Sequence, residues 1–217
     1  MAFLRTALAN LTVPRLLPLV FTVLYTLAAA LYFSSVGNQE FLGYIAVIVL
    51  LVTVGGCVLA HQCTPAWILW LLASVGLLHF LGAAVVIGGD ILYNYVPFHI
   101  ENPSGLTFIK FDQIVHTYGS GVAAVLSYFF LSRYSTFRAF GLFVFCVLAA
   151  MGIGALNEIV EFFATMTVPD TDVGGYYNTA VDLCVNLLGA IAGAALCAWM
   201  WRSDAAANLH NTTSKRA

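Results

Sequence analysis

The stretch FRAFGLFVFCVLAAMGIGALNEIVEFFAT, residues 137–165, decides the fold. It is apolar along almost its whole length, and it exceeds the roughly 20 helical residues that cross a hydrocarbon core. Soluble domains carry about 25% charged residues, whereas this chain is 8% charged and 61% hydrophobic. The sequence therefore predicts an integral membrane protein.

Five further apolar runs are long enough to span a membrane as helices. A barrel strand would need only about 10 residues and would alternate in polarity. The six predicted spans are 14–34, 41–60, 65–89, 111–132, 137–165 and 177–201. We therefore predict an all-α, polytopic membrane protein. Residues 1–202 form a bundle of six transmembrane helices, and residues 203–217 form a disordered cytoplasmic tail.

Basic residues predict the orientation of the bundle. Seven of the eight Lys and Arg residues fall on one side of a six-span map: Arg5, Arg15, Arg133, Arg138, Arg202, Lys215 and Arg216. The positive-inside rule then places both termini in the cytoplasm. The apolar part of the first span, 16–33, exceeds the 7–15 residues of a typical signal core. We therefore expect an uncleaved anchor.

Polar side chains on four spans gather in the opposite, outer half of the membrane, and His79 is the deepest of them. Ionisable residues are costly in lipid and normally face the bundle interior. We therefore expect these groups to line one outward-facing site within the bundle. The predicted members are His79, Asp112, His116, Asn157, Glu158, Glu161, Asn178, Asp182 and Asn186.

This set of side chains resembles the ligands of metal sites in helical bundles. We predict His79, His116 and Asp182 as metal ligands and a divalent metal such as zinc as the cofactor, although the residues leave the cofactor open. The predicted catalytic residues are Asp112, Glu158 and Glu161, with a glutamate as general base. The predicted amides, Asn157, Asn178 and Asn186, complete the polar site. No Glu-x-x-His pair is present, so the bundle di-iron site is not expected.

Alternative interpretations remain for single members of this set. Asp112 begins a helix, so it is also suited to an N-cap. His79 or His116 alone is also consistent with a hydrogen-bonded histidine inside a bundle. The same residues together can form a proton or cation pathway without a metal. The pair Glu158 and Glu161, three residues apart in an apolar helix, is the hardest to explain as solvated surface.

Three motifs carry a resemblance to a known family. They are FDQIVHTYGSG, ALNEIVEFF and DLCVNLLGAIAGA, and they contain Asp112 and His116, then Glu158 and Glu161, then Asp182, Asn186 and Gly189. Together they resemble the YjdF-like inner-membrane proteins and, more distantly, the VanZ-like proteins, over roughly residues 76–195. The resemblance implies a polytopic inner-membrane protein and does not imply a reaction. The VanZ-like proteins are linked to glycopeptide resistance, which suggests envelope lipids or their polymers for those proteins, and the distant match does not carry this to the present chain.

Two further features give weaker signals. Gly189 and Gly193 form a GxxxG pattern, which usually indicates close helix packing. The outer segment 90–110 is rich in aromatic residues and is either an interfacial segment or a lid that carries His99 and Glu101.

Three function classes follow from these observations. The first is a metal-dependent enzyme acting on a lipid or lipid-linked envelope substrate, which makes membrane lipids the expected partners. The second is a small-molecule or ion-coupled transporter, and the third is a non-catalytic accessory subunit. No nucleic-acid partner is expected, and the oligomeric state is left open.

Overall fold

The computed structural model describes residues 2–97, 109–169, 171 and 173–214, with residue 2 and residues 201–214 described by backbone alone. Its elements are α1 (Ala2–Ala9), α2 (Val13–Val36), α3 (Gln39–His61), α4 (Ala66–Ala84), β1 (Val86–Ile87), β2 (Asp90–Ile91), the 3-10 helix η1 (Leu92–Asn94), α5 (Phe111–Tyr134), α6 (Ala139–Thr167) and α7 (Tyr176–Ser214). Within the described residues, six helices, α2 to α7, are long and apolar enough to cross a membrane. The predicted all-α polytopic membrane fold is thus confirmed.

Two boundaries differ from the prediction. The third span was expected to reach residue 89, but α4 ends at Ala84 and the chain enters a two-stranded hairpin. Gly88 and Gly89 both have positive φ angles, which suit a tight turn between the strands. The last helix extends to Ser214, past residue 202, where the predicted bundle ends and the predicted disordered tail follows. Disorder of the tail in solution remains a prediction.

The described chain divides into two compact units. Unit 1 comprises residues 1–115 and 158–178, and unit 2 comprises residues 116–157 and 179–217. Helices α5, α6 and α7 contribute residues to both units.

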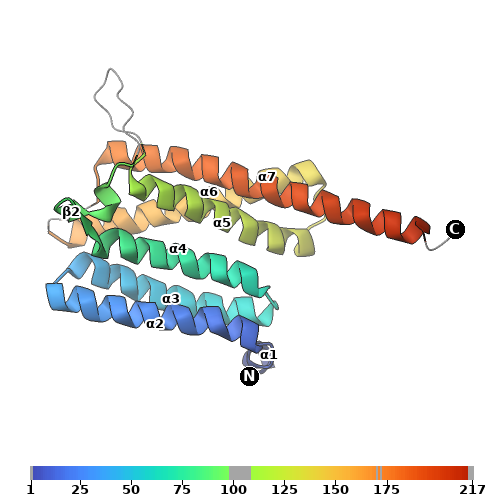
Figure 1. The fold of residues 1–217 in the computed structure, drawn as a ribbon, viewed down its shortest axis with the longest axis horizontal. Coiled ribbons are helices and arrows are strands. Elements are labelled where there is room, and N and C mark those ends of the chain that lie inside the picture. The colour runs from blue at the N-terminus through green and yellow to red at the C-terminus, as the bar shows by residue number, and fades with distance from the viewer. Residues whose placement is uncertain (1, 98–108, 170, 172, 215–217) are drawn as a thin grey trace, which may run out of the picture. The chain divides into compact units, whose positions relative to one another are not determined.

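Unit 1 contains three helices that pack side by side, α2 against both α3 and α4 (Figure 1). Aromatic residues dominate its core, where the rings of Phe33 and Phe41 stack with centroids 4.9 Å apart and Phe80 packs beside them. Gly37 ends α2 in the left-handed conformation, and Asn38 then caps α3 by accepting a hydrogen bond from the Phe41 amide. The tight turn brings α3 back antiparallel to α2.

Side chains also cap the C-terminal end of α3. Asn10 donates from its amide to the carbonyl oxygens of Ala60 and His61, which lie in the last turn of α3. Arg15 donates to the carbonyls of Asn10 and Cys63. These bonds supply partners for carbonyls that a helix leaves unpaired at its C-terminus, and they hold the start of α2 beside the end of α3.

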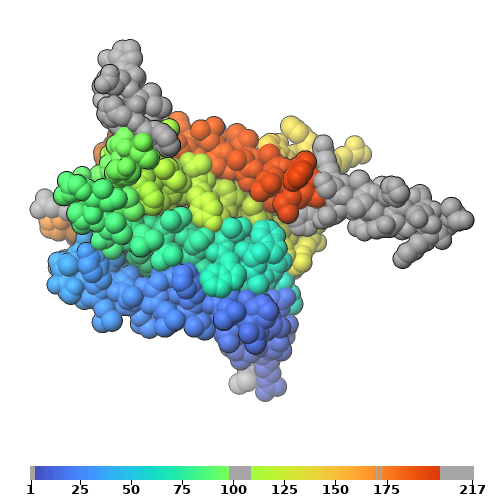
Figure 2. All heavy atoms as spheres, in the orientation of Figure 1, coloured from blue at the N-terminus to red at the C-terminus, as the bar shows by residue number. Residues whose placement is uncertain are grey.

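The outer segment after α4 is anchored to that helix. The Leu92 amide donates to the Val85 carbonyl, and the Tyr93 ring lies over Gly82. Figure 2 shows the green segment from residue 86 to 97 at this end of α4. Residues 98–108, which include His99 and Glu101 of the predicted lid, lie outside the described residues.

In unit 2, α5 and α7 approach closely through glycines. A Cβ atom on Gly189 would overlap the Thr117 carbonyl, and one on Gly193 would overlap the Gly121 carbonyl. Both residue numbers increase together along the contact, so the two helices run parallel.

Candidate metal centre

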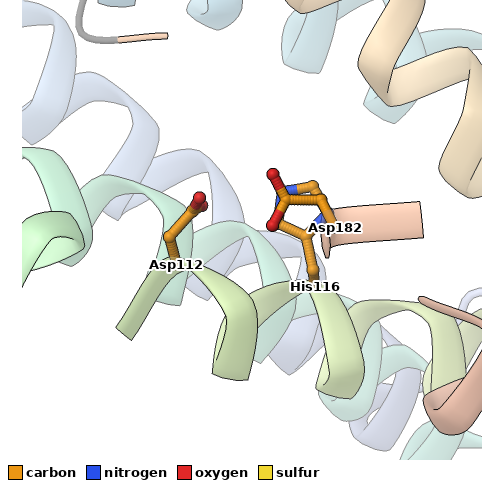
Figure 3. A group of neighbouring side chains, drawn as sticks. All are labelled: Asp112, His116 and Asp182. Atoms are coloured by element: carbon orange, nitrogen blue, oxygen red, sulfur yellow. The ribbon is translucent and has the colours of Figure 1, made fainter. Parts of the chain in front are cut away.

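Helix α5 presents a carboxylate and an imidazole on one face. It begins at Phe111, and Asp112 and His116 are one turn apart, so they point the same way. Asp182 of α7 places its carboxylate beside the His116 ring (Figure 3). One ligand atom from each of the three residues lies within 4.8 Å of the other two. We call Asp112, His116 and Asp182 the first group.

The face of α7 that carries Asp182 is polar and buried. Asn178, Asp182 and Asn186 repeat every four residues, which keeps them on one side of the helix. Asp182 is 0% exposed and Asn186 is 2% exposed, whereas Leu188 is 63% exposed. A helix that packs in a bundle surrounded by lipid shows this pattern, because its polar residues face the bundle interior and its leucines face the lipid. At the start of the helix, Asn178 Nδ2 donates a hydrogen bond to Asp112 Oδ2, and the two atoms are 3.3 Å apart.

Gly154 on α6 leaves space for the side-chain amide of Asn186. A Cβ atom on Gly154 would lie 2.8 Å from Asn186 Nδ2. Among the described residues, Nδ2 has no hydrogen-bond partner. An amide donor that is buried in this way is satisfied when a bound ligand supplies an oxygen.

Helix α6 carries two more carboxylates. Glu158 follows Gly154 by one turn, so it faces the same side of α6, and it is only 8% exposed. Its apolar neighbours Leu156 and Phe162 are 61% and 58% exposed. Ligand atoms of His116, Glu158 and Glu161 also lie within 4.8 Å of one another, and we call these three residues the second group.

The remaining predicted members lie outside both groups. His79 Nδ1 forms a hydrogen bond with the Tyr93 hydroxyl oxygen, and the two atoms are 2.8 Å apart. Its ring is therefore bonded to the outer segment of unit 1, and the groups contain one histidine, His116, in place of the predicted pair. Asn157 precedes Glu158 and is half-buried.

Sequence reasoning missed three residues of unit 1 that belong to the same acidic environment. Glu40 is 6% exposed and accepts a hydrogen bond from the Tyr44 hydroxyl. Tyr93, outside the membrane spans, has its pKa raised well above the ordinary value by burial and then by the negative charges of Asp112 and Glu161. Its hydroxyl therefore stays protonated. The signal for Glu40 and Tyr44 was present in their spacing of one turn.

The donor set suits a divalent cation. Carboxylate oxygens and imidazole nitrogens bind zinc and manganese. His116 with two carboxylates gives three protein ligands, the number found in a catalytic zinc site, which keeps a fourth position open for water.

Comparison with known proteins identifies the family. A family model described as predicted membrane protein (DUF2238) matches residues 17–203. No curated protein and no solved structure shows a significant match. Because the matched segment covers most of the chain and contains all the members of both groups, the protein belongs to this DUF2238 family of predicted membrane proteins, which is the YjdF-like family.

Proposed function

We propose that this membrane protein is a metal-dependent enzyme that acts on a lipid or lipid-linked envelope substrate from the outer leaflet of the plasma membrane. The observation that carries the proposal is the first group, an imidazole and two carboxylates whose ligand atoms lie within 4.8 Å inside apolar spans. Three ligands of this kind leave a cation with an open position for water or substrate.

The residues divide into roles by position. Asp112, His116 and Asp182 hold the cation. Glu158 and Glu161 provide a carboxylate that accepts the proton of the attacking water, which is general-base catalysis.

A lipid-linked substrate fits the position of the site along the helices. Asp112 is the second residue of α5 and Asp182 the seventh of α7, so both lie near helix ends, about two turns or less from the interface. A headgroup at the interface can reach this depth while its chains remain in the lipid.

The transporter alternative requires a polar path through the rest of the bundle. The first half of α6, from Ala139 to Ala150, contains no ionisable residue apart from Cys146. We therefore prefer the enzyme, and we retain proton or ion handling as the second candidate because the same carboxylates would serve it.

The first test is metal content. Protein purified in detergent and supplied with zinc should bind the cation, and His116→Ala and Asp182→Asn should each lose it while keeping helical content and elution volume. His61→Ala, at the far end of α3, is the matched control and should bind like the unchanged protein. Folded protein that binds no divalent cation would contradict the metal-dependent enzyme and favour proton or ion handling.

A further inference from the structure

The short helix α1 lies across one end of unit 1 (Figure 1). The Phe3 ring stacks on the His61 ring with centroids 4.4 Å apart. Directly after α1, the Asn10 amide donates to the carbonyl oxygens of Ala60 and His61. Eight helical residues extend about 12 Å, so a helix that ran alongside α3 would contact residues about two turns apart. Both ends of α1 instead contact the last turn of α3, which means that α1 crosses α3 there.

This crossing lies at the level of the membrane surface. Helix α3 is long and apolar enough to span a membrane, whereas the eight residues of α1 are too few to do so. Helix α4 begins after a short turn at the same end of unit 1, and its first two turns carry the exposed residues Trp67 and Trp70. Tryptophan is enriched at the interface between lipid and water. We therefore place α1 along that interface.

The side chains of α1 suit this position. Ala7 is buried at 4% exposure, whereas Leu4 and Leu8, one turn apart, are 54% and 67% exposed. Thr6 lies midway between the two leucines in the sequence, so at about 100° per residue it points to the opposite side of the helix. Helices that lie in the membrane surface have an apolar face toward the acyl chains and a polar face toward water, and α1 has both.

The charged residues of α1 to α4 at this end of unit 1 are basic. Arg5 is exposed on α1, and Arg15 is held at the start of α2 by hydrogen bonds to two carbonyl oxygens. Residues 1–89 contain a single acidic residue, Glu40, and it lies in the first turn of α3, at the opposite end of that helix. Basic residues next to a membrane attract anionic headgroups.

We propose that α1 binds the lipid surface of the adjacent leaflet and selects anionic phospholipids. Leu4 and Leu8 insert at the boundary of the acyl chains, and Arg5 binds the anionic headgroup. The hydrogen bonds of Asn10 and Arg15 fix α1 to the ends of α2 and α3, so a lipid bound at α1 is held against the helices of unit 1. This surface contains no member of either ligand group and is independent of the proposed function.

Photocrosslinking from α1 tests its position in the full-length protein. Benzoylphenylalanine is introduced in place of Leu8 or Thr6, and the protein is placed in nanodiscs with equal amounts of phosphatidylglycerol and phosphatidylcholine. Lipid adducts are measured by mass spectrometry after irradiation. We expect adducts from position 8 and severalfold fewer from position 6, because the two positions face opposite sides of α1. Equal yields from both positions, or no lipid adduct from position 8, overturn the proposal.

The ratio of the two lipids in the adducts tests the selection by charge. One arginine near an anionic surface contributes about 1 kcal/mol, or about fivefold in affinity, so phosphatidylglycerol should be enriched by that factor at position 8. Arg5→Ala should lower the ratio to that of the nanodisc, whereas Arg138→Ala, which removes an exposed arginine before α6, should keep the enrichment.

Two results contradict the selection of anionic lipid. Equal amounts of the two lipids in adducts of the protein with Arg5 present overturn it, and enrichment that persists in Arg5→Ala overturns the role of Arg5. Where the probe at position 8 prevents folding, the probe in place of Leu4, on the same face of α1, gives the same measurement.

Discussion

At the residue scale, the contact between Gly154 and Asn186 connects two helices that carry the acidic residues. Because Gly154 has no side chain, the buried amide of Asn186 can lie against the α6 backbone. Sequence spacing predicted that Asn178, Asp182 and Asn186 share a face, but it did not predict which neighbour they meet. That contact depends on the rotation of α6 about its own axis, and both sides of α6 are largely apolar in the sequence.

This contact predicts opposite effects for two glycines on the same helix. Gly154→Ala brings a methyl group against Asn186, and such overpacking typically costs about 1–3 kcal/mol. Gly152 has no atom within 4 Å of an added Cβ, so Gly152→Ala should raise helix stability by up to about 1 kcal/mol. Thermal unfolding in detergent measures both, and equal stability of the two variants would show that Asn186 does not occupy this space.

At the element scale, α5 and α7 approach each other closely at two glycines of α7. The sequence identified Gly189 and Gly193 as a packing motif, and the structure places both against the α5 backbone at Thr117 and Gly121. The span boundaries were predicted to within a few residues because apolar length is read directly from composition. The predicted end of α4 was wrong because the residues that follow the helix are as apolar as the helix itself. These residues, Val85, Val86 and Ile87, lead into the hairpin instead.

Packing between these helices is tested by adding a large side chain. Gly189→Leu should lower the yield and thermal stability of the purified protein, because α7 can then no longer approach the Thr117 carbonyl. The control is Gly43→Leu on α3, where an added Cβ meets no atom within 4 Å and a leucine would face lipid. Normal stability of Gly189→Leu would mean that this glycine does not face α5.

At the scale of the whole molecule, composition alone predicted the class and the number of spans. The candidate site was predicted only in outline. Helical rise shows which polar residues lie at similar depth, but membrane helices are apolar on their lipid face as well as inside, so periodicity does not show which residues meet. His79 illustrates this limit: its partner Tyr93 is reached through the hairpin at residues 86–91, whose path no sequence pattern indicated.

Orientation in the membrane is the property on which the outward-facing site depends. The parallel contact of α5 and α7 means that Asp112 and Asp182, each near the start of its helix, enter from the same side. The distribution of arginine and lysine predicts that this side is external. Reporter fusions at residue 135 and at the C-terminus should therefore read cytoplasmic, and a fusion near residue 172 should read external. A reporter at the C-terminus that reads external would show that the membrane orientation is the reverse of the predicted one. The cluster of carboxylates would then face the cytoplasm, and an outer-leaflet substrate would have no route to it.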